Sequence, residues 1–199
     1  ELYGGAVETR IANDLEEILA WIDGGEEPRT ITDANFQPNR LNSLRSRLSA
    51  AYKGLNVLVQ REGSKDFFWK ASIRDLEADE VALDIHHIFP KAWCESEERQ
   101  LRPADYDSVI NKTPISYKAN RMIGGNAPSS YLRTLQNHKQ VGLDDAAMDA
   151  LLVSHRIDPV ALRADDFAAF FEARGRALCA IISDAMGKPI DTDQVQFLN

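Results

Sequence analysis

Two neighbouring histidines, His86 and His87, lie in the segment LDIHHIFPKAW, where the flanking apolar residues are typical of a strand or its end. Because neighbouring side chains of a strand point to opposite faces, the two rings cannot both bind one metal ion in a simple strand. One imidazole can hold a cation while the other acts as a base, since an unperturbed pKa of about 6.5 keeps much of it neutral. This division of roles suits phosphodiester hydrolysis, which needs a base for water and a cation for the phosphate.

A second segment, VINKTPISYKANRMIGGNAPSSYL from Val109, could supply the remaining groups. A divalent ion on one histidine needs a further ligand from a neighbouring rigid element, and Asn120 is the candidate. A histidine and an amide oxygen leave most coordination positions to water and phosphate oxygens, which suits Mg²⁺ or Mn²⁺ better than a closed zinc site. Asn111 could tie the histidine-bearing loop to the second strand through side-chain hydrogen bonds.

These residues need elements that bring them together. We expect a strand over 81–90 that ends at Pro90, and a second short strand in VINKTPIS. Ser116 can then cap a short helix, YKANRM, that Gly124 and Gly125 terminate. This strand–loop–strand–helix unit would occupy residues 81–127.

The rest of the chain shows helical patterns. A first helix carries an apolar stripe and ends at Gly24, a loop follows over 25–40, and a second helix is expected over 41–60. Another helix opens at Pro128, and Asp165 or Asp166 caps a long C-terminal one. The predicted fold class is mainly α with a small α+β insert. We expect one domain over 1–199, with helical parts at 1–80 and 128–199.

Composition restricts the function classes. The 199 residues are 44% hydrophobic and 27% charged, without an apolar run of membrane-spanning length, a signal peptide or a CxxC pair. The expectation is a soluble, cytoplasmic protein with no membrane partner. The net charge is −8, yet residues 40–53 carry four bases and residues 108–141 carry five, with no acid in either window. Charge alone leaves two alternatives open, a DNA-binding face and a solvated helix face.

The ordered residues resemble the HNH, or ββα-metal, nuclease motif. The match runs through Asp84-x-His86-His87-Ile88-x-Pro90, then Asn111, then Lys118-x-Asn120-Arg121, then Asn126-x-Pro128-Ser129. It is similar to the variant with Asn at the third position, as in the HNH domain of the RNA-guided CRISPR nuclease. The whole chain, from NRLNSLRSRL through FFEARGRALCAIISDAMGK, resembles the C-terminal HNH domains of GmrSD-type, modification-dependent restriction proteins.

The resemblance implies a role for each matched residue. It makes His87 the general base and Asn111 the loop-bracing member of the catalytic set, and it assigns one divalent metal ion to His86 and Asn120. His86 replaces the Asp of the CRISPR variant, and a neutral ligand weakens the preference for Mg²⁺. Mg²⁺ is therefore the first expectation, with Mn²⁺, Ni²⁺ or Zn²⁺ as alternatives.

Further residues surround this expected centre. Asp84 matches an acidic position near the metal, and its role stays open. Lys118 and Arg121 would hold neighbouring DNA phosphates, the alternative being ordinary solvated charges of a helix. The two other histidines, His138 and His155, are predicted to be surface residues.

The resemblance predicts a metal-dependent DNA endonuclease domain of a restriction, or anti-phage defence, protein. Water activated by His87 would attack phosphorus in line, giving a 5′-phosphate and a 3′-hydroxyl and nicking one strand. Family members carry an N-terminal nucleotide-binding domain with a DGQQR motif, which is absent here, so we expect a C-terminal fragment of a longer protein. Two alternatives remain: a catalytically silent DNA-binding or effector-docking domain that keeps the fold, and a helical interaction module with structural histidines.

Overall fold

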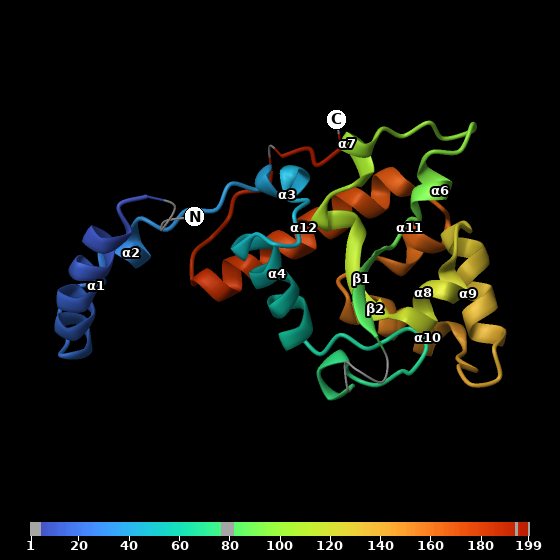
Figure 1. Cartoon of the computed structure of the whole chain (residues 1–199), viewed down its shortest axis with the longest axis horizontal. Coiled ribbons are helices and arrows are strands. Elements are labelled where there is room, and N and C mark those ends of the chain that lie inside the picture. Colours follow the sequence, from blue (N-terminus) through green and yellow to red (C-terminus); the bar gives the residue numbers. More distant parts are fainter. Residues whose placement is uncertain (1–4, 77–81, 194, 199) are drawn as a thin grey trace. The chain divides into compact units, whose positions relative to one another are not determined.

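The computed structural model describes residues 5–76, 82–193 and 195–198. As predicted, the chain is mainly helical with a small two-stranded antiparallel sheet (Figure 1). The chain divides into two compact units, residues 1–37 and 38–199. The boundary falls in the mostly exposed segment 25–40, where the sequence predicted a loop. None of the helices in the described ranges is both long and apolar enough to cross a bilayer.

The first unit contains α1 (Val7–Ile22), where the sequence predicted a helix, and α2 (Arg29–Thr32), a single helical turn inside the predicted loop. The second unit contains all the remaining elements. Those outside the sheet region are α3 (Arg40–Ser43), α4 (Ala50–Arg61), η2 (Ile73–Asp75), α6 (Lys91–Cys94), α7 (Pro103–Tyr106), α9 (Pro128–Asn137), α10 (Asp145–Ser154), α11 (Pro159–Arg163) and α12 (Phe167–Met186).

The helix expected over 41–60 is divided into α3 and α4. Leu44 adopts an extended conformation with ψ of 92°, which ends α3, and the chain turns through residues 45–49. Ser49 then begins α4, because its hydroxyl accepts a hydrogen bond from the backbone N–H of Tyr52. The apolar periodicity continues across the break, so it concealed the boundary.

The sheet and its following helix have ββα order. β1 (Leu83–His87) pairs antiparallel with β2 (Lys112–Ser116), so that His86 lies opposite Thr113 and His87 opposite Lys112. A 3₁₀ turn, η3 (Val109–Asn111), leads into β2, and α8 (Tyr117–Ile123) follows it and lies against both strands (Figure 1). Ser116 caps α8 through the N–H of Ala119, as predicted.

A buried carboxylate holds the junction between β2 and α8. Asp66 is fully buried, and its side chain accepts hydrogen bonds from the backbone N–H and the hydroxyl of Ser116, at 2.6 and 3.0 Å. The same carboxylate accepts from the N–H groups of Phe68 and Trp69. These four hydrogen bonds compensate the buried side chain for the water it has lost, and they fix the direction in which α8 leaves the sheet.

Phe89, two residues after His87, anchors the end of β1 in the core. Phe89 is fully buried, and its ring lies 4.9 Å from that of Phe170 and 5.3 Å from that of Phe167, both on α12. Tyr131 of α9 donates a hydrogen bond to the carbonyl of Ile88. Burial of one such aromatic side chain contributes roughly 1.5–3 kcal/mol, which secures the end of the strand that carries the histidines.

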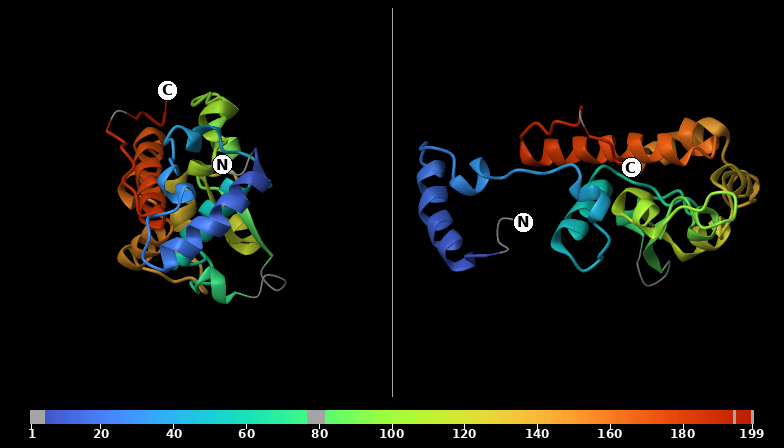
Figure 2. Two further views of the ribbon diagram at one scale, coloured as in Figure 1. Left: turned by 90° about the vertical axis from the view of Figure 1, so that its left-hand side faces the viewer. Right: turned by 90° about the horizontal axis from the view of Figure 1, so that it is seen from above.

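A buried arginine of α12 supports the start of β2. α12 is the longest helix of the described ranges (Figure 2), and it runs beside α4 and η3. Its Arg174 is 1% exposed and donates to the carbonyl oxygens of Val109, Ile110 and Lys112, and also to that of His155. Because burial penalises its charge, the pKa of Arg174 falls to about 9.

The prediction that His155 lies on the surface is wrong. The side chain is fully buried, with Nδ1 2.7 Å from the hydroxyl of Thr113 and Nε2 2.7 Å from the carbonyl oxygen of Lys65. A carbonyl can only accept, so Nε2 carries the proton and Nδ1 accepts from Thr113. The ring is therefore a neutral link between β2 and the segment before Asp66. His138, in contrast, is partly exposed and packs beside Phe68.

His155 should make the stability of the fold depend on pH. Burial lowers the pKa of His155 to about 4, whereas an unfolded histidine titrates near 6.5. The unfolded chain then binds the proton more readily, so the contribution of His155 is complete above pH 6.5 and declines as the pH falls towards 4. We expect a loss of about 3 kcal/mol across this range, measured as the free energy of unfolding in urea at several pH values.

Carboxylates also titrate in this range, so the comparison must be between variants. His155→Gln should lose much less stability between pH 6.5 and 4 than the unmodified chain, because no imidazole is left to protonate. His138→Gln is the matched control and should keep the full pH dependence. Parallel curves for the unmodified chain and His155→Gln would contradict the assignment.

Candidate functional site

The two neighbouring histidines of β1 lie in different surroundings. Strand alternation places them on opposite faces, as the sequence predicted. His86 has its Nε2 atom buried, with no hydrogen-bond partner among the described residues. His87 instead pairs across the site: its Nε2 lies 3.0 Å from Oδ1 of Asp107. One ring is thus satisfied by a carboxylate, and the other has a buried nitrogen without a partner.

Asp107 binds a second group besides His87. The ammonium group of Lys112 lies 2.5 Å from the same Oδ1 atom, and Lys112 is itself almost fully buried. Lys112 and His87 are opposite each other in the β1–β2 register, which places their side chains on one face of the sheet. The result is a row of three groups, Lys112, Asp107 and His87, in which the carboxylate is central.

Both imidazoles are biased towards the neutral form. Burial lowers the pKa of His87, and the charge of Lys112 lowers it further, although the hydrogen bond to Asp107 opposes the change. Burial likewise lowers the pKa of His86, with Asp84 acting against it and Arg47 reinforcing it. A neutral imidazole can accept a proton or bind a metal ion, so both rings are in the state that the predicted chemistry needs.

Asn111 braces the chain that follows the histidines. It is fully buried; its Oδ1 accepts from the N–H of Phe89 at 2.8 Å, and its Nδ2 donates to the carbonyl of Phe89 at 3.0 Å. Its backbone carbonyl also accepts from the N–H of Ile88. These contacts match the bracing role that was expected, and they make Asn111 a positioning residue because the side chain is used on the protein's own backbone.

Asp84 forms an ion pair with Arg47. Its Oδ1 lies 2.5 Å from Nη1 of Arg47, and Arg47 also donates to the carbonyl of Ile85. Burial would raise the pKa of Asp84, but the hydrogen bonds from Arg47 and from the backbone N–H of Ile85, together with the charge of Arg47, hold the pKa below its ordinary value. Asp84 and His86 share a face of β1 by strand alternation. Arg47 therefore lies close to the histidine pair, although it is 37 residues from Asp84 in the chain.

The remaining predicted site residues are on α8. Asn120 is partly buried, and its side-chain amide makes no hydrogen bond within the ranges described. Lys118 and Arg121 are exposed, with Lys118 Nζ 5.2 Å from the ring centre of Phe68 and the Arg121 guanidinium 5.8 Å from that of Tyr117. Neither base pairs with an acidic side chain in the described part of the chain. Both charges are available to an external anion.

The donors available to a metal ion are few. Within the described residues, no three His, Cys, Asp or Glu side chains gather in a group that could hold one. The predicted pair differs from such a group because its second ligand is an amide. The unpartnered, buried Nε2 of His86 fits a metal ligand, since a buried polar atom without a partner otherwise costs about 1–3 kcal/mol.

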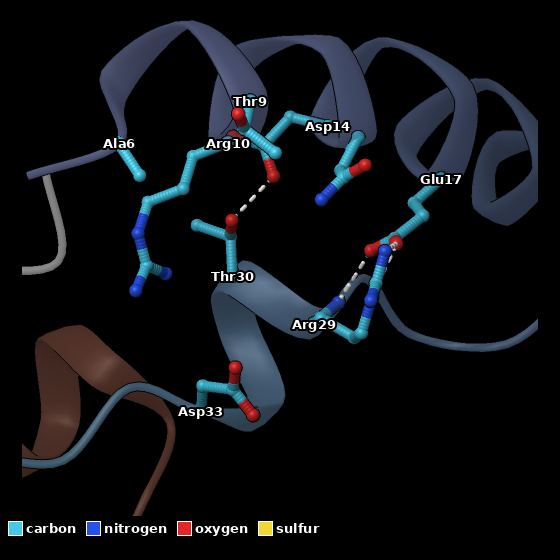
Figure 3. A pocket seen from close by; sticks show the side chains of 9 residues that line it. Ala6, Thr9, Arg10, Asp14, Glu17, Arg29, Thr30 and Asp33 are labelled. Atoms are coloured by element: carbon cyan, nitrogen blue, oxygen red, sulfur yellow. Dashed lines mark hydrogen bonds and ion pairs between the residues drawn. The ribbon is translucent and has the colours of Figure 1, made fainter.

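The first unit contains a pocket whose lining includes none of the predicted site residues. It lies between α1 and α2, and Figure 3 shows Arg29 reaching Glu17 and Thr30 reaching Asp14 across it. The carboxylate of Glu17 accepts hydrogen bonds from the backbone N–H and from Nε of Arg29, at 2.8 and 2.6 Å, and Thr30 donates to Asp14 (Figure 3). These pairs hold α2 against α1.

Sequence reasoning missed Asp107, Lys112 and Arg47 as site residues. Asp107 and Lys112 lie in the segment DSVINK around the predicted Asn111, but nothing in their spacing indicates an ion pair with His87. Arg47 belongs to the first acid-free basic window, so charge patterning was a partial signal. Its contact with Asp84 depends on the turn between α3 and α4, which the periodicity did not reveal.

Comparison with known proteins gives one distant relative. The chain is 28% identical to an uncharacterized protein of Methanocaldococcus jannaschii, over an alignment that covers 73% of this chain and 25% of the other. The chain thus spans about a quarter of the length of the curated relative that it matches. No family model matches the chain, and no solved structure matches it significantly.

Proposed function

We propose that this chain is a metal-dependent DNA endonuclease domain that hydrolyses phosphodiester bonds. The observation that carries the proposal is the contrast between the two rings of β1. His87 is neutral and hydrogen-bonded to Asp107, as a general base needs, while His86 has a buried nitrogen without a partner among the described residues, as a metal ligand needs. The surrounding elements follow one another in the order β1, β2 and α8, which is the order of strands and helix that the resemblance implies.

The reaction would consume one water molecule. Its oxygen forms a bond to phosphorus while one of its protons passes to His87, and the bond from phosphorus to the 3′ oxygen breaks. The 3′ oxygen takes a proton from solvent, and the products carry a 5′-phosphate and a 3′-hydroxyl. A divalent cation held by His86 and Asn120 would, when bound, neutralise the charge that develops on the phosphate and the departing oxygen.

The same proposal assigns Lys118 and Arg121, the two basic residues of α8, to binding of DNA phosphates. Lys118 and Arg121 are exposed cations on the helix that carries Asn120, so they can contact phosphates on either side of the cut. Such contacts are independent of sequence and weaken with salt. Recognition of modified DNA and dependence on a nucleotide would belong to another domain of the same protein, of the DGQQR type, in the restriction setting that the resemblance implies.

Plasmid nicking tests the proposed function. Supercoiled plasmid is incubated with the chain and Mg²⁺, Mn²⁺, Ni²⁺ or Zn²⁺, with EDTA as the control, and conversion to the open circle is measured. We expect conversion with at least one ion and none with EDTA. If no ion supports conversion but the chain still retards DNA in a gel, the catalytically silent alternative is favoured. Absence of both activities would favour a helical interaction module.

Metal binding should depend on Asn120. Asn120→Ala removes one of two proposed protein ligands, so calorimetry with Mn²⁺ should show roughly a tenfold or greater loss of affinity, since even indirect partners of a metal contribute that much. Asn137→Ala, an exposed amide at the end of α9, is the matched control and should bind as the unmodified chain does. Equal affinity in Asn120→Ala would remove this residue from the ligand set.

A further inference from the structure

We infer that Asp107 is a positioning residue that fixes which nitrogen of His87 carries the proton, and that Lys112 holds Asp107 in place for this task. The inference rests on the proposed function, because it gives the basic nitrogen of the proposed catalytic base. It is carried by two contacts to one atom: Oδ1 of Asp107 lies 3.0 Å from Nε2 of His87 and 2.5 Å from Nζ of Lys112.

The direction of the hydrogen bond follows from the charge of Asp107. Burial would raise the pKa of this carboxyl, but the hydrogen bonds from Lys112 and His87 outweigh burial, so its pKa lies below the ordinary value. Asp107 is therefore ionised at neutral pH, and an ionised carboxylate can only accept hydrogen bonds. Nε2 of His87 must be the donor, which leaves Nδ1 as the basic nitrogen of the neutral ring.

The surroundings make this contact rigid. Asp107 directly follows α7, and its backbone N–H closes the last turn on the carbonyl of Pro103. The buried ring of Tyr106 meets the His87 ring edge to face, with centroids 5.9 Å apart, and its hydroxyl donates to Glu95. Lys112 is the first residue of β2 and lies opposite His87 in the register. Both partners of the carboxylate thus come from the paired strands.

This arrangement would also act after proton transfer. When water gives a proton to Nδ1, His87 becomes an imidazolium ion with a hydrogen on each nitrogen. The negative charge of Asp107 stabilises that ion at Nε2, and Lys112 keeps the carboxylate from taking the proton itself. A carboxylate that orients a histidine base in this way is worth several orders of magnitude in rate in hydrolases. Nδ1 of His87 has no hydrogen-bond partner in the ranges that the structure describes, so it is free to act.

The tautomer can be read directly in the metal-free chain. Histidine ring ¹⁵N spectra near pH 7.5 should show His87 protonated at Nε2 with an unprotonated Nδ1. Asp107→Asn keeps the shape of the side chain but offers an amide N–H as well as a carbonyl, so the spectrum should shift towards the Nδ1–H tautomer. Asp149→Asn is the control, because Asp149 is 37% exposed against 34% for Asp107 and pairs with Arg163 on other elements.

Nicking kinetics then connect the tautomer to the reaction. Asp107→Asn should lower kcat roughly a hundredfold or more and leave KM for DNA nearly unchanged, because Asp107 does not touch DNA. Asp149→Asn should leave both the spectrum and kcat unchanged. A merely structural role would instead reduce the folded fraction, visible by circular dichroism, without moving the ¹⁵N signals of the remaining folded chain.

The outcomes separate this inference from the proposed function. An Nδ1–H tautomer in the unmodified chain would overturn the inference even if the plasmid is nicked. An unchanged kcat in Asp107→Asn, with or without a shift of tautomer, would also overturn it. If no metal ion supports nicking but the Nε2–H tautomer shifts in Asp107→Asn, the proposed function fails and the tautomer assignment alone stands.

Discussion

His87→Ala should lower the rate of metal-dependent plasmid nicking by roughly a thousandfold, within the range of about 10²–10⁴ that general-base catalysis contributes. The variant loses the only group that the proposal gives for accepting the water proton. The side chain is 27% exposed and makes one side-chain hydrogen bond, so its loss should disturb the core little. The measurement is the first-order conversion of supercoiled to open-circular DNA at saturating metal.

Two further measurements on His87→Ala test whether the variant has lost only the chemical step and still folds and binds DNA. DNA retention in a gel and the thermal unfolding midpoint should both stay near those of the unmodified chain. His138→Ala, a partly exposed histidine packed against Phe68, is the matched control and should nick normally. A His87→Ala variant that nicks as fast as the unmodified chain would show that the base is another group.

Arg174→Met should lower the free energy of unfolding by about 3 kcal/mol or more. The side chain is buried and donates to four backbone carbonyls, which methionine cannot satisfy. Each buried acceptor that loses its only donor costs about 1–3 kcal/mol, and part of this is offset because the buried charge disappears as well. Urea denaturation followed by circular dichroism measures the change.

The control lies two residues further along the same helix. Arg176 is 44% exposed and donates to the carbonyls of Thr192 and Val195, so Arg176→Met should cost less than about 1 kcal/mol. Three of the four acceptors of Arg174 lie between Val109 and Lys112, the segment that carries Asn111 and leads into β2. Equal destabilisation by the two variants would mean that Arg174 does not support this segment.

Local signals in the sequence were sufficient for several elements. Ser116 caps α8 and Gly124, with φ of +55°, follows its last residue, because the hydroxyl acceptor and the glycine conformation act within one turn of helix. Asp166 caps α12, one of the two residues predicted for that role, and Gly187 ends it. The other candidate, Asp165, instead accepts hydrogen bonds from Ser129 at the start of α9. That partner is 36 residues away, beyond the reach of a local rule.

Some contacts of the candidate site could likewise be predicted from the sequence, and others could not. Adjacent histidines on a strand must face opposite sides, so their different surroundings follow from the sequence. The bracing contacts of Asn111 were expected from the motif order, and the side chain reaches the backbone of Phe89 as that role requires. The Asp107–His87 contact spans 20 residues and depends on where the turn after α7 folds back, which no periodicity encodes.

The sequence by itself determined the helical class, the short sheet and the order of the residues that could do chemistry, because caps, glycine turns and side-chain alternation act over a few residues. Only the tertiary structure decided which polar groups are buried together. His155, Arg174 and Asp66 each have at least one partner that lies 19 to 90 residues away, and their burial follows from the packing of whole elements. Desolvation is a property of that packing, so neither the lowered pKa values of the histidines nor the ionised state of Asp107 can be read from neighbours in the chain.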